Sequence, residues 1–326
     1  ELGHEAGPGK FIHDLAEIFR EAHRVLRDDG TLFVNIGDSH VHWNRTLKLD
    51  RDKSPPEKSM FAIPWRLGIA LQDDGWIVRQ ALIWAKSGGN CPRCHFRMEK
   101  GSAMPQPVRD RFVSAHEYVI FAVKKPKYYF DYVAVQQDGA NRRDVLFLTA
   151  TPFRHNANTE NGEDQQKRHF AVMSENLAEV CIQAGTPEQT CGVCGAPWTR
   201  LVKARKESKA ERLSRVKELS DVAPRHDGGA LQQGIHIGTF EKETIGWKPS
   251  CECGGEVLPG IVLDPFSGTG TTGAVGLRLG RRYFGIDVDP EIKPVAEARL
   301  ESELLARETA APASWLTDEQ GFCLPP

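Results

Sequence analysis

A glycine-rich turn joins an apolar segment to a predicted helix near the end of the sequence. Residues 261–264 (IVLD) run into PFSGTGTTG, and Asp287 closes the next predicted strand. Glycines let the backbone approach a ligand closely, and the first turn of a helix favours negative charge. A carboxylate after the neighbouring strand can accept hydrogen bonds from both hydroxyls of a ribose. The pattern predicts a nucleotide-like cofactor at this turn.

Two other interpretations of the turn remain open at this point. Gly268, Gly270 and Gly273 match GxGxxG, so a nicotinamide dinucleotide is one alternative, although this motif alone is weak. A dinucleotide domain usually continues with more strand–helix units, whereas one predicted strand follows the turn here. A tight turn without any ligand is the other alternative.

The eight cysteines include three close pairs. These are Cys91 and Cys94, Cys191 and Cys194, and Cys251 and Cys253. The sequence shows no secretory signal, so metal binding in a reducing compartment is favoured over disulfides. The last two pairs together would give a closed, four-thiolate structural zinc site, with four free thiols as the alternative. Cys91 and Cys94 supply only half of the ligands of such a site. For this pair, a plain turn or an incomplete site is favoured over a second metal site completed by residues elsewhere.

Predicted strands alternate with predicted helices along most of the sequence. The helices are 10–28, 63–73, 174–184, 269–279 and 290–306; the strands are 31–36, 76–86, 116–124, 260–264 and 282–288. This alternation predicts an α/β fold with a mostly parallel sheet. The core covers 1–185 and 258–306, with 186–257 as a zinc-ribbon-like, basic insertion and 307–326 as a loose tail. Within the core, residues 138–168 are expected to be irregular.

Composition excludes several classes of protein. Of the 326 residues, 42 are Lys or Arg and 44 are Asp or Glu, which gives a net charge of −2. This balance excludes a simple polybasic nucleic-acid binder but leaves room for a local basic face. A hydrophobic content of 40% excludes wholesale disorder, and no apolar run approaches the ~18 residues of a membrane span.

The form DPFSGTGTT at 264–272 resembles the S-adenosylmethionine loop of the amino-group DNA methyltransferases, which methylate N4 of cytosine or N6 of adenine. Other segments resemble the same family: LRDDGTLFVNIGDS (26–39), IPWR (63–66), DGW (74–76), IWAK (83–86), RDR (109–111), HE (116–117) and KRHFAV (167–172). With the glycine-rich loop last, the order is that of the permuted subclass whose catalytic half comes first. The resemblance implies a Rossmann-like methyltransferase fold for most of the chain.

The resemblance also implies which residues bind S-adenosylmethionine. They are Asp264, Phe266, Gly268, Gly270, Thr271, Thr272 and Asp287, together with His169 and Phe170. Asp287 would hold the ribose, Thr271 and Thr272 would lie near the methionine end, and Phe170 would flank the adenosine or methionine part.

The catalytic signature of this family, Ser/Asp-Pro-Pro-Tyr/Phe, is not found in the 326 residues. Ser54-Pro55-Pro56-Glu57 lacks the aromatic residue and lies in a predicted polar loop. We expect the signature and its strand directly upstream of Glu1; its loss is the alternative. Within the sequence, Asp38 is the best candidate for the base pocket, because it follows a buried strand at its carboxyl end. A helix or turn cap is the alternative role for Asp38.

The implied reaction transfers a methyl group to the exocyclic amine of a base that has left the duplex. N4 of cytosine is favoured over N6 of adenine, because relatives of the 26–39 segment tend to carry Ser-Pro-Pro-Tyr. A catalytically inactive, zinc-containing DNA-binding relative and a nicotinamide-dependent oxidoreductase are the alternatives.

Double-stranded DNA is the implied partner, and a homodimer is left open. Target recognition in this subclass usually maps to about 87–165, which contains Arg109 and Arg111. The insertion also contains a run of basic residues. Such a run is usually just a solvated surface. Here we predict that it contacts DNA phosphates through Arg205, Lys206, Lys209 and Arg212. The resemblance places such a protein in the cytoplasm, with the nucleoid, as a bacterial or phage product.

Overall fold

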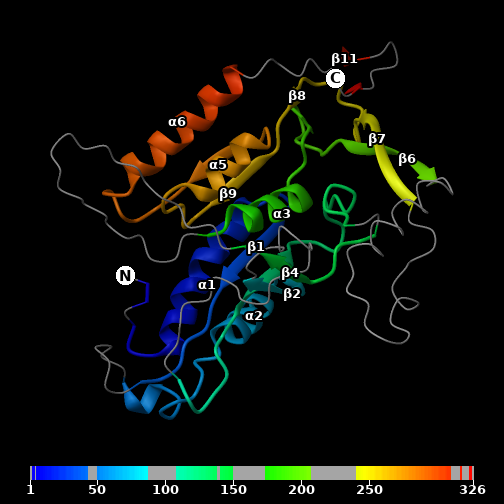
Figure 1. The fold of residues 1–326 in the computed structure, drawn as a ribbon. Coiled ribbons are helices and arrows are strands. Elements are labelled where there is room, and N and C mark those ends of the chain that lie inside the picture. Colours follow the sequence, from blue (N-terminus) through cyan, green and yellow to red (C-terminus); the bar gives the residue numbers. More distant parts are fainter. Residues whose placement is uncertain are drawn as a thin grey trace, which may run out of the picture.

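A computed structural model of the chain describes residues 2–3, 5–42, 50–86, 108–137, 140–149, 173–206, 240–309, 316–317 and 323–324. Its strands form a four-stranded sheet in the core, a parallel pair, and two antiparallel sheets, of two and four strands, that include the strands of the insertion, with helices packed around the core (Figure 1). The expected α/β class is confirmed. Among the described helices, none combines the length and the apolar character needed to cross a membrane.

The four-stranded sheet is mixed, so the expectation of a mostly parallel sheet is wrong. Its strands are β1 (Thr31–Ile36), β2 (Ile77–Lys86), β3 (His116–Val123) and β4 (Val145–Leu148), in the order β1-β3-β2-β4. β3 is antiparallel to both β1 and β2, and β4 is parallel to β2. β1 and β2 therefore run in the same direction, and the helix α2 (Ile63–Asp73) lies between them in the chain. Adjacent parallel strands usually need a helical crossover between them. The sequence predicts a loop rather than a helix between β2 and β3, which agrees with their antiparallel pairing.

Element boundaries follow the sequence pattern closely in this half. β1 and α2 coincide with their predicted ranges. The helix α1 (Pro8–Val25) ends earlier than predicted, because Leu26 leaves the helix with extended backbone angles. β4 lies in a segment expected to be irregular, and its four apolar residues, VLFL, are the signal that the prediction missed.

The second half supplies the parallel pair. β9 (Ile261–Asp264) pairs in parallel with β10 (Arg282–Gly285), and α5 (Thr271–Arg278) connects them as a crossover helix. The helix α6 (Lys293–Thr309) follows and packs on α5.

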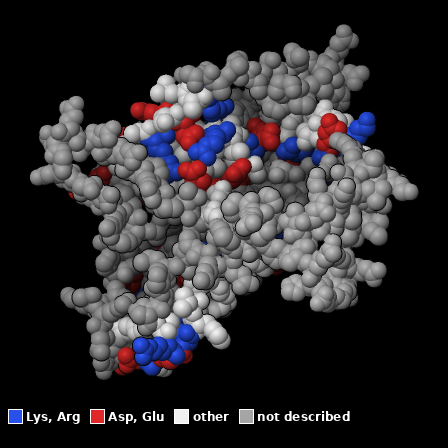
Figure 2. Space-filling model, viewed as in Figure 1, with Lys and Arg blue, Asp and Glu red and all other residues white. Residues whose placement is uncertain are grey.

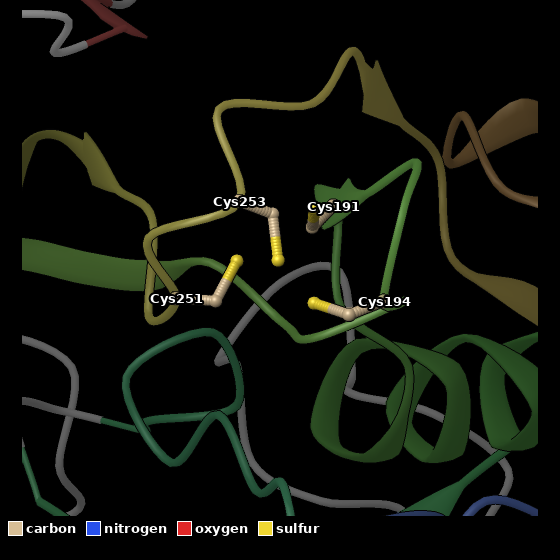
Figure 3. A group of neighbouring side chains, drawn as sticks. All are labelled: Cys191, Cys194, Cys251 and Cys253. Atoms are coloured by element: carbon tan, nitrogen blue, oxygen red, sulfur yellow. The ribbon is translucent and has the colours of Figure 1, made fainter.

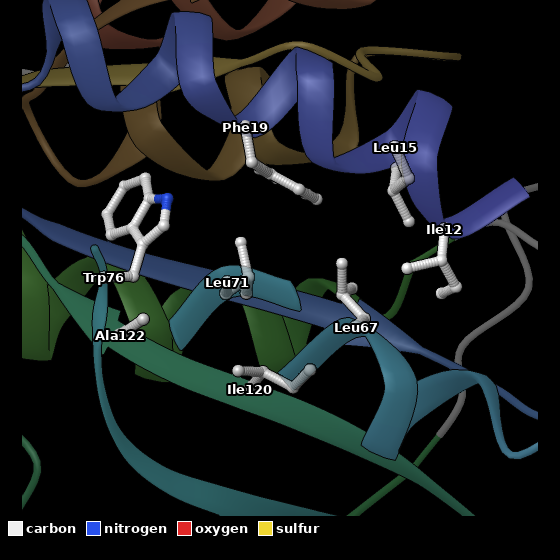
Figure 4. Close-up of a cluster of buried hydrophobic side chains, with 8 residues drawn as sticks. All are labelled: Ile12, Leu15, Phe19, Leu67, Leu71, Trp76, Ile120 and Ala122. Carbon is white, nitrogen blue, oxygen red and sulfur yellow. The ribbon is translucent and has the colours of Figure 1, made fainter. Parts of the chain in front are cut away.

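The largest buried cluster lies between α1, α2 and β3 (Figure 4). It consists of Ile12, Leu15, Phe19, Leu67, Leu71, Trp76, Ile120 and Ala122. The members from α1 recur at spacings of three and four, so they share one face of that helix. Because neighbouring residues of a strand point to opposite faces, Ile120 faces α1 and α2 while Val119 faces the other side.

The helix α3 (Glu175–Gly185) covers that other side and connects the two halves of the core. Its Leu177 and Cys181 pack against the four-stranded sheet, and burial raises the pKa of the Cys181 thiol to about 12. Its Ala178 and Ile182 pack instead against β9 and α5. One helix therefore positions the parallel pair relative to the four-stranded sheet.

Two antiparallel sheets include the strands of the insertion. One pairs β5 (Thr190–Cys191) with β8 (Val257–Leu258); the other contains β6 (Thr199–Lys206), β7 (Phe240–Lys248), β11 (Leu316–Thr317) and β12 (Cys323–Leu324). β12 pairs with β7 at Trp247, so part of the segment expected to be a loose tail extends the sheet of the insertion. β6 pairs with one edge of β7, and the other edge supplies the backbone groups for this pairing.

Candidate functional site

Hydrogen bonds from its backbone N–H groups hold the glycine-rich turn after β9. Asp264 accepts a hydrogen bond from the Phe266 N–H at 2.9 Å, and the Ser267 N–H donates to the Ile286 carbonyl at 2.9 Å. Gly268 and Gly270 have φ values of +51° and +75°, a conformation that favours glycine. The turn therefore needs glycine at the two positions that the sequence singles out for close approach to a ligand.

Asp287 lies directly beside this turn. Its Oδ2 accepts the Gly268 N–H at 2.7 Å, and its Oδ1 accepts the Asp289 N–H at 2.9 Å. The side chain is exposed, and a carboxylate offers about four acceptor positions, so it can also accept hydrogen bonds from a ligand. The structure thus brings together Asp264, Gly268, Gly270 and Asp287 as the sequence predicts.

Apolar side chains surround the carboxylate. Phe266 is 44% exposed, and its ring meets the edge of the Phe19 ring from α1 at a centroid distance of 6.2 Å. Ile286 and Val288, which flank Asp287, are 58% and 93% exposed. Such exposed apolar groups next to a carboxylate suit a ligand with both a flat ring and hydroxyl groups.

The start of α5 is fastened by residues that sequence reasoning missed. Arg299 of α6 donates to the Thr271 hydroxyl at 2.9 Å and pairs with Glu175 of α3 at 2.5 Å. Burial alone would raise the pKa of Glu175, but hydrogen bonds and charge from Arg278 and Arg299 outweigh it and lower that pKa. No local pattern could have shown this pairing, because Glu175 and Arg299 are 124 positions apart.

The two predicted threonines have different surroundings. Thr271 is 4% exposed, and its hydroxyl accepts the Arg299 hydrogen bond. Thr272 is half-buried, and its hydroxyl lies 3.9 Å from the Met173 sulfur. Their contact with the methionine end of a cofactor stays a prediction.

Gly273 carries a prediction about stability. A Cβ there would lie 2.5 Å from the Tyr283 ring and 2.6 Å from Leu300. We expect Gly273→Ala to lower the free energy of unfolding by about 1–3 kcal/mol, as overpacking does. Gly276→Ala, on the same helix, is the control: its nearest neighbour would be 3.8 Å away, so stability should stay equal or rise by up to about 1 kcal/mol. Urea unfolding measures both, and equal midpoints would contradict the packing argument.

Asp38 lies after β1, as predicted, and both its oxygens are engaged. They accept the N–H groups of Ala62 at 3.0 Å and Ile63 at 3.3 Å, at the start of α2. The capping role named as the alternative is therefore what its contacts show. A further role in the base pocket stays a prediction.

Polar residues from three of the segments that resemble the family meet at the same end of the sheet. Glu117 accepts the Asn35 amide N–H at 3.0 Å and pairs with Lys86, which also stacks over the Trp84 ring at 5.1 Å. All four side chains come from neighbouring strands, β1, β2 and β3, so only the pairing of the sheet brings them together.

The four cysteines of the predicted metal site meet in space (Figure 3). Their sulfur atoms all lie within 4.8 Å of one another. Hydrogen bonds from the Cys194 and Val193 N–H groups lower the pKa of the Cys191 thiol to about 6. The cluster has the ligand types and the closeness that a tetrahedral metal site requires.

Of the predicted DNA-contacting residues, the structure describes the side chains of Arg109 and Arg111. Arg109 is exposed, whereas Arg111 donates to the Phe112 carbonyl at 3.0 Å. Arg200, at the start of β6, is a basic residue of the insertion that is buried against Asp131. On the face seen in Figure 2, basic and acidic residues of the described parts are intermingled.

Several predicted residues cannot be placed. His169, Phe170, Lys209, Arg212, Cys91 and Cys94 lie outside the described residues. Arg205 and Lys206 belong to the backbone of β6, but their side chains are outside the description.

Comparisons with known proteins all point to DNA methyltransferases. A family model described as DNA methylase, for the N6/N4 group, matches residues 2–191 and 258–298. Type II methyltransferase M.Cfr9I of Citrobacter freundii is 29% identical over 322 residues, covering 93% of this chain and 75% of that protein. Type II methyltransferase M.SmaI of Serratia marcescens is 28% identical over 321 residues, covering 92% and 77%.

A solved structure shares the fold. It is the PvuII DNA methyltransferase, described as cytosine-N4-specific, with a TM-score of 0.53 and 14% sequence identity. The similarity covers 90% of this chain and 71% of that one. The family match, which covers most of the chain, establishes that the chain belongs to the N6/N4 family of DNA methylases.

Proposed function

We propose that this protein transfers a methyl group from S-adenosylmethionine to the exocyclic amine of a flipped DNA base. The main support for this proposal is the geometry of the turn after β9. There the exposed Asp287 carboxylate accepts a hydrogen bond from the Gly268 N–H at 2.7 Å. Exposed apolar side chains lie next to that carboxylate, and membership in the DNA methylase family supports the reaction class.

The residues around the turn fit S-adenosylmethionine. Asp287 would accept the ribose hydroxyls with the acceptor positions that Gly268 and Asp289 leave free. Ile286 and Val288 would cover the adenine ring, and Phe266 would close the other side. Bound there, S-adenosylmethionine supplies a methyl group whose bond to the sulfonium sulfur breaks as the bond to the amine nitrogen forms.

The amine itself needs hydrogen-bond acceptors, because its lone pair is delocalised into the base. Acceptors for the NH2 hydrogens make the nitrogen more nucleophilic, and the amine gives up one proton on methylation. A Ser/Asp-Pro-Pro-aromatic segment would supply a side-chain oxygen, a carbonyl and a stacking ring. Asp38 is a further candidate acceptor, beside its bonds to the start of α2.

We place the strand that carries this segment between β9 and β1. Among the described strands, β9 pairs only with β10 and β1 pairs only with β3, so each has one free edge. α3 packs on both parts of the core, and Phe19 on α1 contacts Phe266 at the end of β9. A strand there would have both edges paired and would end next to the cofactor turn. A full-length sequence without a Pro-Pro-aromatic segment would contradict this placement.

Cytosine N4 is the amine that we propose. The structural neighbour described as cytosine-N4-specific and the resemblance of the 26–39 segment support this choice. Because DNA is the substrate, the proposal places the protein with the nucleoid. It assigns no step to the four-cysteine cluster, since a zinc ion with four thiolates has no open position.

Methylation of unmodified genomic DNA by the full-length protein tests the proposal. Nucleoside mass spectrometry should find N4-methylcytosine when S-adenosylmethionine is present and none when it is left out. N6-methyladenine would support the reaction and overturn the choice of base. Cofactor binding in calorimetry without any methylated base would instead favour a catalytically inactive DNA-binding relative.

A further inference from the structure

We infer that Cys191, Cys194, Cys251 and Cys253 bind one zinc ion, which acts as a clasp that closes the base of the insertion and fastens it to the core. The clasp needs neither a cofactor nor DNA, so this inference stands apart from the proposed methyl transfer.

The arrangement of the sulfur atoms fits zinc. A tetrahedral ion with Zn–S bonds of about 2.3 Å holds its sulfurs about 3.8 Å apart. The four sulfurs already lie within 4.8 Å of one another and point toward a common centre (Figure 3). Small side-chain rotations would therefore complete the site.

The backbone around each cysteine pair is folded as a tight turn. In both pairs the second cysteine is followed by a glycine with positive φ, Gly195 at +69° and Gly254 at +62°. The Gly195 N–H donates to the Cys191 carbonyl at 2.7 Å. Two turns, which precede β6 and follow β7, therefore present their thiols to the same point.

The cluster lies where the two sides of the insertion meet. Cys194 precedes β6 and Cys251 follows β7. The ion would therefore join these two paired strands at the end where Thr199 lies opposite Lys248. The strands β5 and β8, which flank the cluster on the core side, pair over two residues each, and the Gly192 N–H donates to the Glu256 carbonyl at 2.7 Å.

The same turn is attached to the core. Arg27, in the turn between α1 and β1, donates to the Cys194 carbonyl at 2.8 Å, while its other nitrogens bind Asp29. On the other side, β8 leads within three residues into β9, and the Thr190 hydroxyl donates to the Leu258 carbonyl at 2.9 Å. A metal ion at the cluster would thus tie the insertion to the turn before β1 and to the approach of β9.

The apolar core of the insertion itself is small. Its buried apolar cluster, among the described residues, consists of Trp198 and Trp247. Two-residue strands and a small hydrophobic cluster do not usually suffice for an independent fold, and structural metal ions commonly supply the missing stability.

Metal analysis of the full-length protein, purified without added metal, tests the clasp. We expect about one zinc per chain, and loss of that zinc in Cys251→Ser/Cys253→Ser. The control is Cys181→Ala, which removes a thiol of the core and should keep the zinc. Iron in place of zinc, no bound metal, or zinc retained in the double variant would each overturn the assignment.

Limited proteolysis tests the mechanical role with the unmodified protein. A thiol-compatible zinc chelator should increase the rate of cleavage within 192–250 by about tenfold or more, and added zinc should restore protection. Cleavage that is equally fast with and without zinc would overturn the clasp even if zinc binds. Both readouts are independent of methylation, so the proposed function can fail while the clasp stands, and the reverse.

Discussion

Replacing Asp287 by Asn is expected to weaken S-adenosylmethionine binding about 100-fold, because one to two charge-assisted hydrogen bonds, each worth about 1.5–3 kcal/mol, are lost. Asn has the same size, but its amide nitrogen cannot accept a hydrogen bond from the Gly268 N–H or from a ribose hydroxyl. Isothermal titration calorimetry with the cofactor measures the change, and circular dichroism checks that the fold is kept.

Asp289→Asn is the matched control for this variant. Asp289 lies two positions further along the same turn, and its carboxylate accepts the Glu291 N–H at 2.9 Å. Its replacement should change cofactor affinity less than about threefold, since removal of one exposed hydrogen bond costs about 0.5 kcal/mol. Equal affinities for Asp287→Asn and the unmodified protein would contradict the assignment of the cofactor site.

Replacing Arg200 by Met should lower the free energy of unfolding by about 3–5 kcal/mol, because it leaves the Asp131 carboxylate buried without its cation. The Asp131 side chain is 6% exposed, and Arg200 reaches it at 2.7 Å and Glu188 at 3.0 Å. The same guanidinium stacks over the Trp247 ring at a distance of 4.3 Å. Chemical denaturation measures the loss.

Two further variants show whether burial causes this effect. Arg24→Met removes an ion pair with Glu21 in which both side chains are 69% exposed, so stability should change by less than about 0.5 kcal/mol. Arg200→Met/Asp131→Asn should regain part of the loss, because no uncompensated charge stays buried. A double variant less stable than the sum of the single changes would refute the buried-charge explanation.

The sequence by itself determined the features that depend on neighbouring residues. Apolar spacing of three and four predicts α1, and a short apolar run predicts β1 at its observed bounds. The glycine-rich turn and the Cys191/Cys194 and Cys251/Cys253 pairs were also evident, because such turns and pairs use residues that are close in the chain.

The tertiary structure alone decided how those elements are arranged and which distant residues meet. It places β3 in the opposite direction between β1 and β2, and lets α3 connect the sheet to the parallel pair. It also pairs Glu175 with Arg299 next to the start of α5, and buries Arg200 of the insertion against Asp131. Such contacts join residues far apart in the chain, so they leave no periodicity or spacing in the sequence, and only the packing of the whole domain selects them.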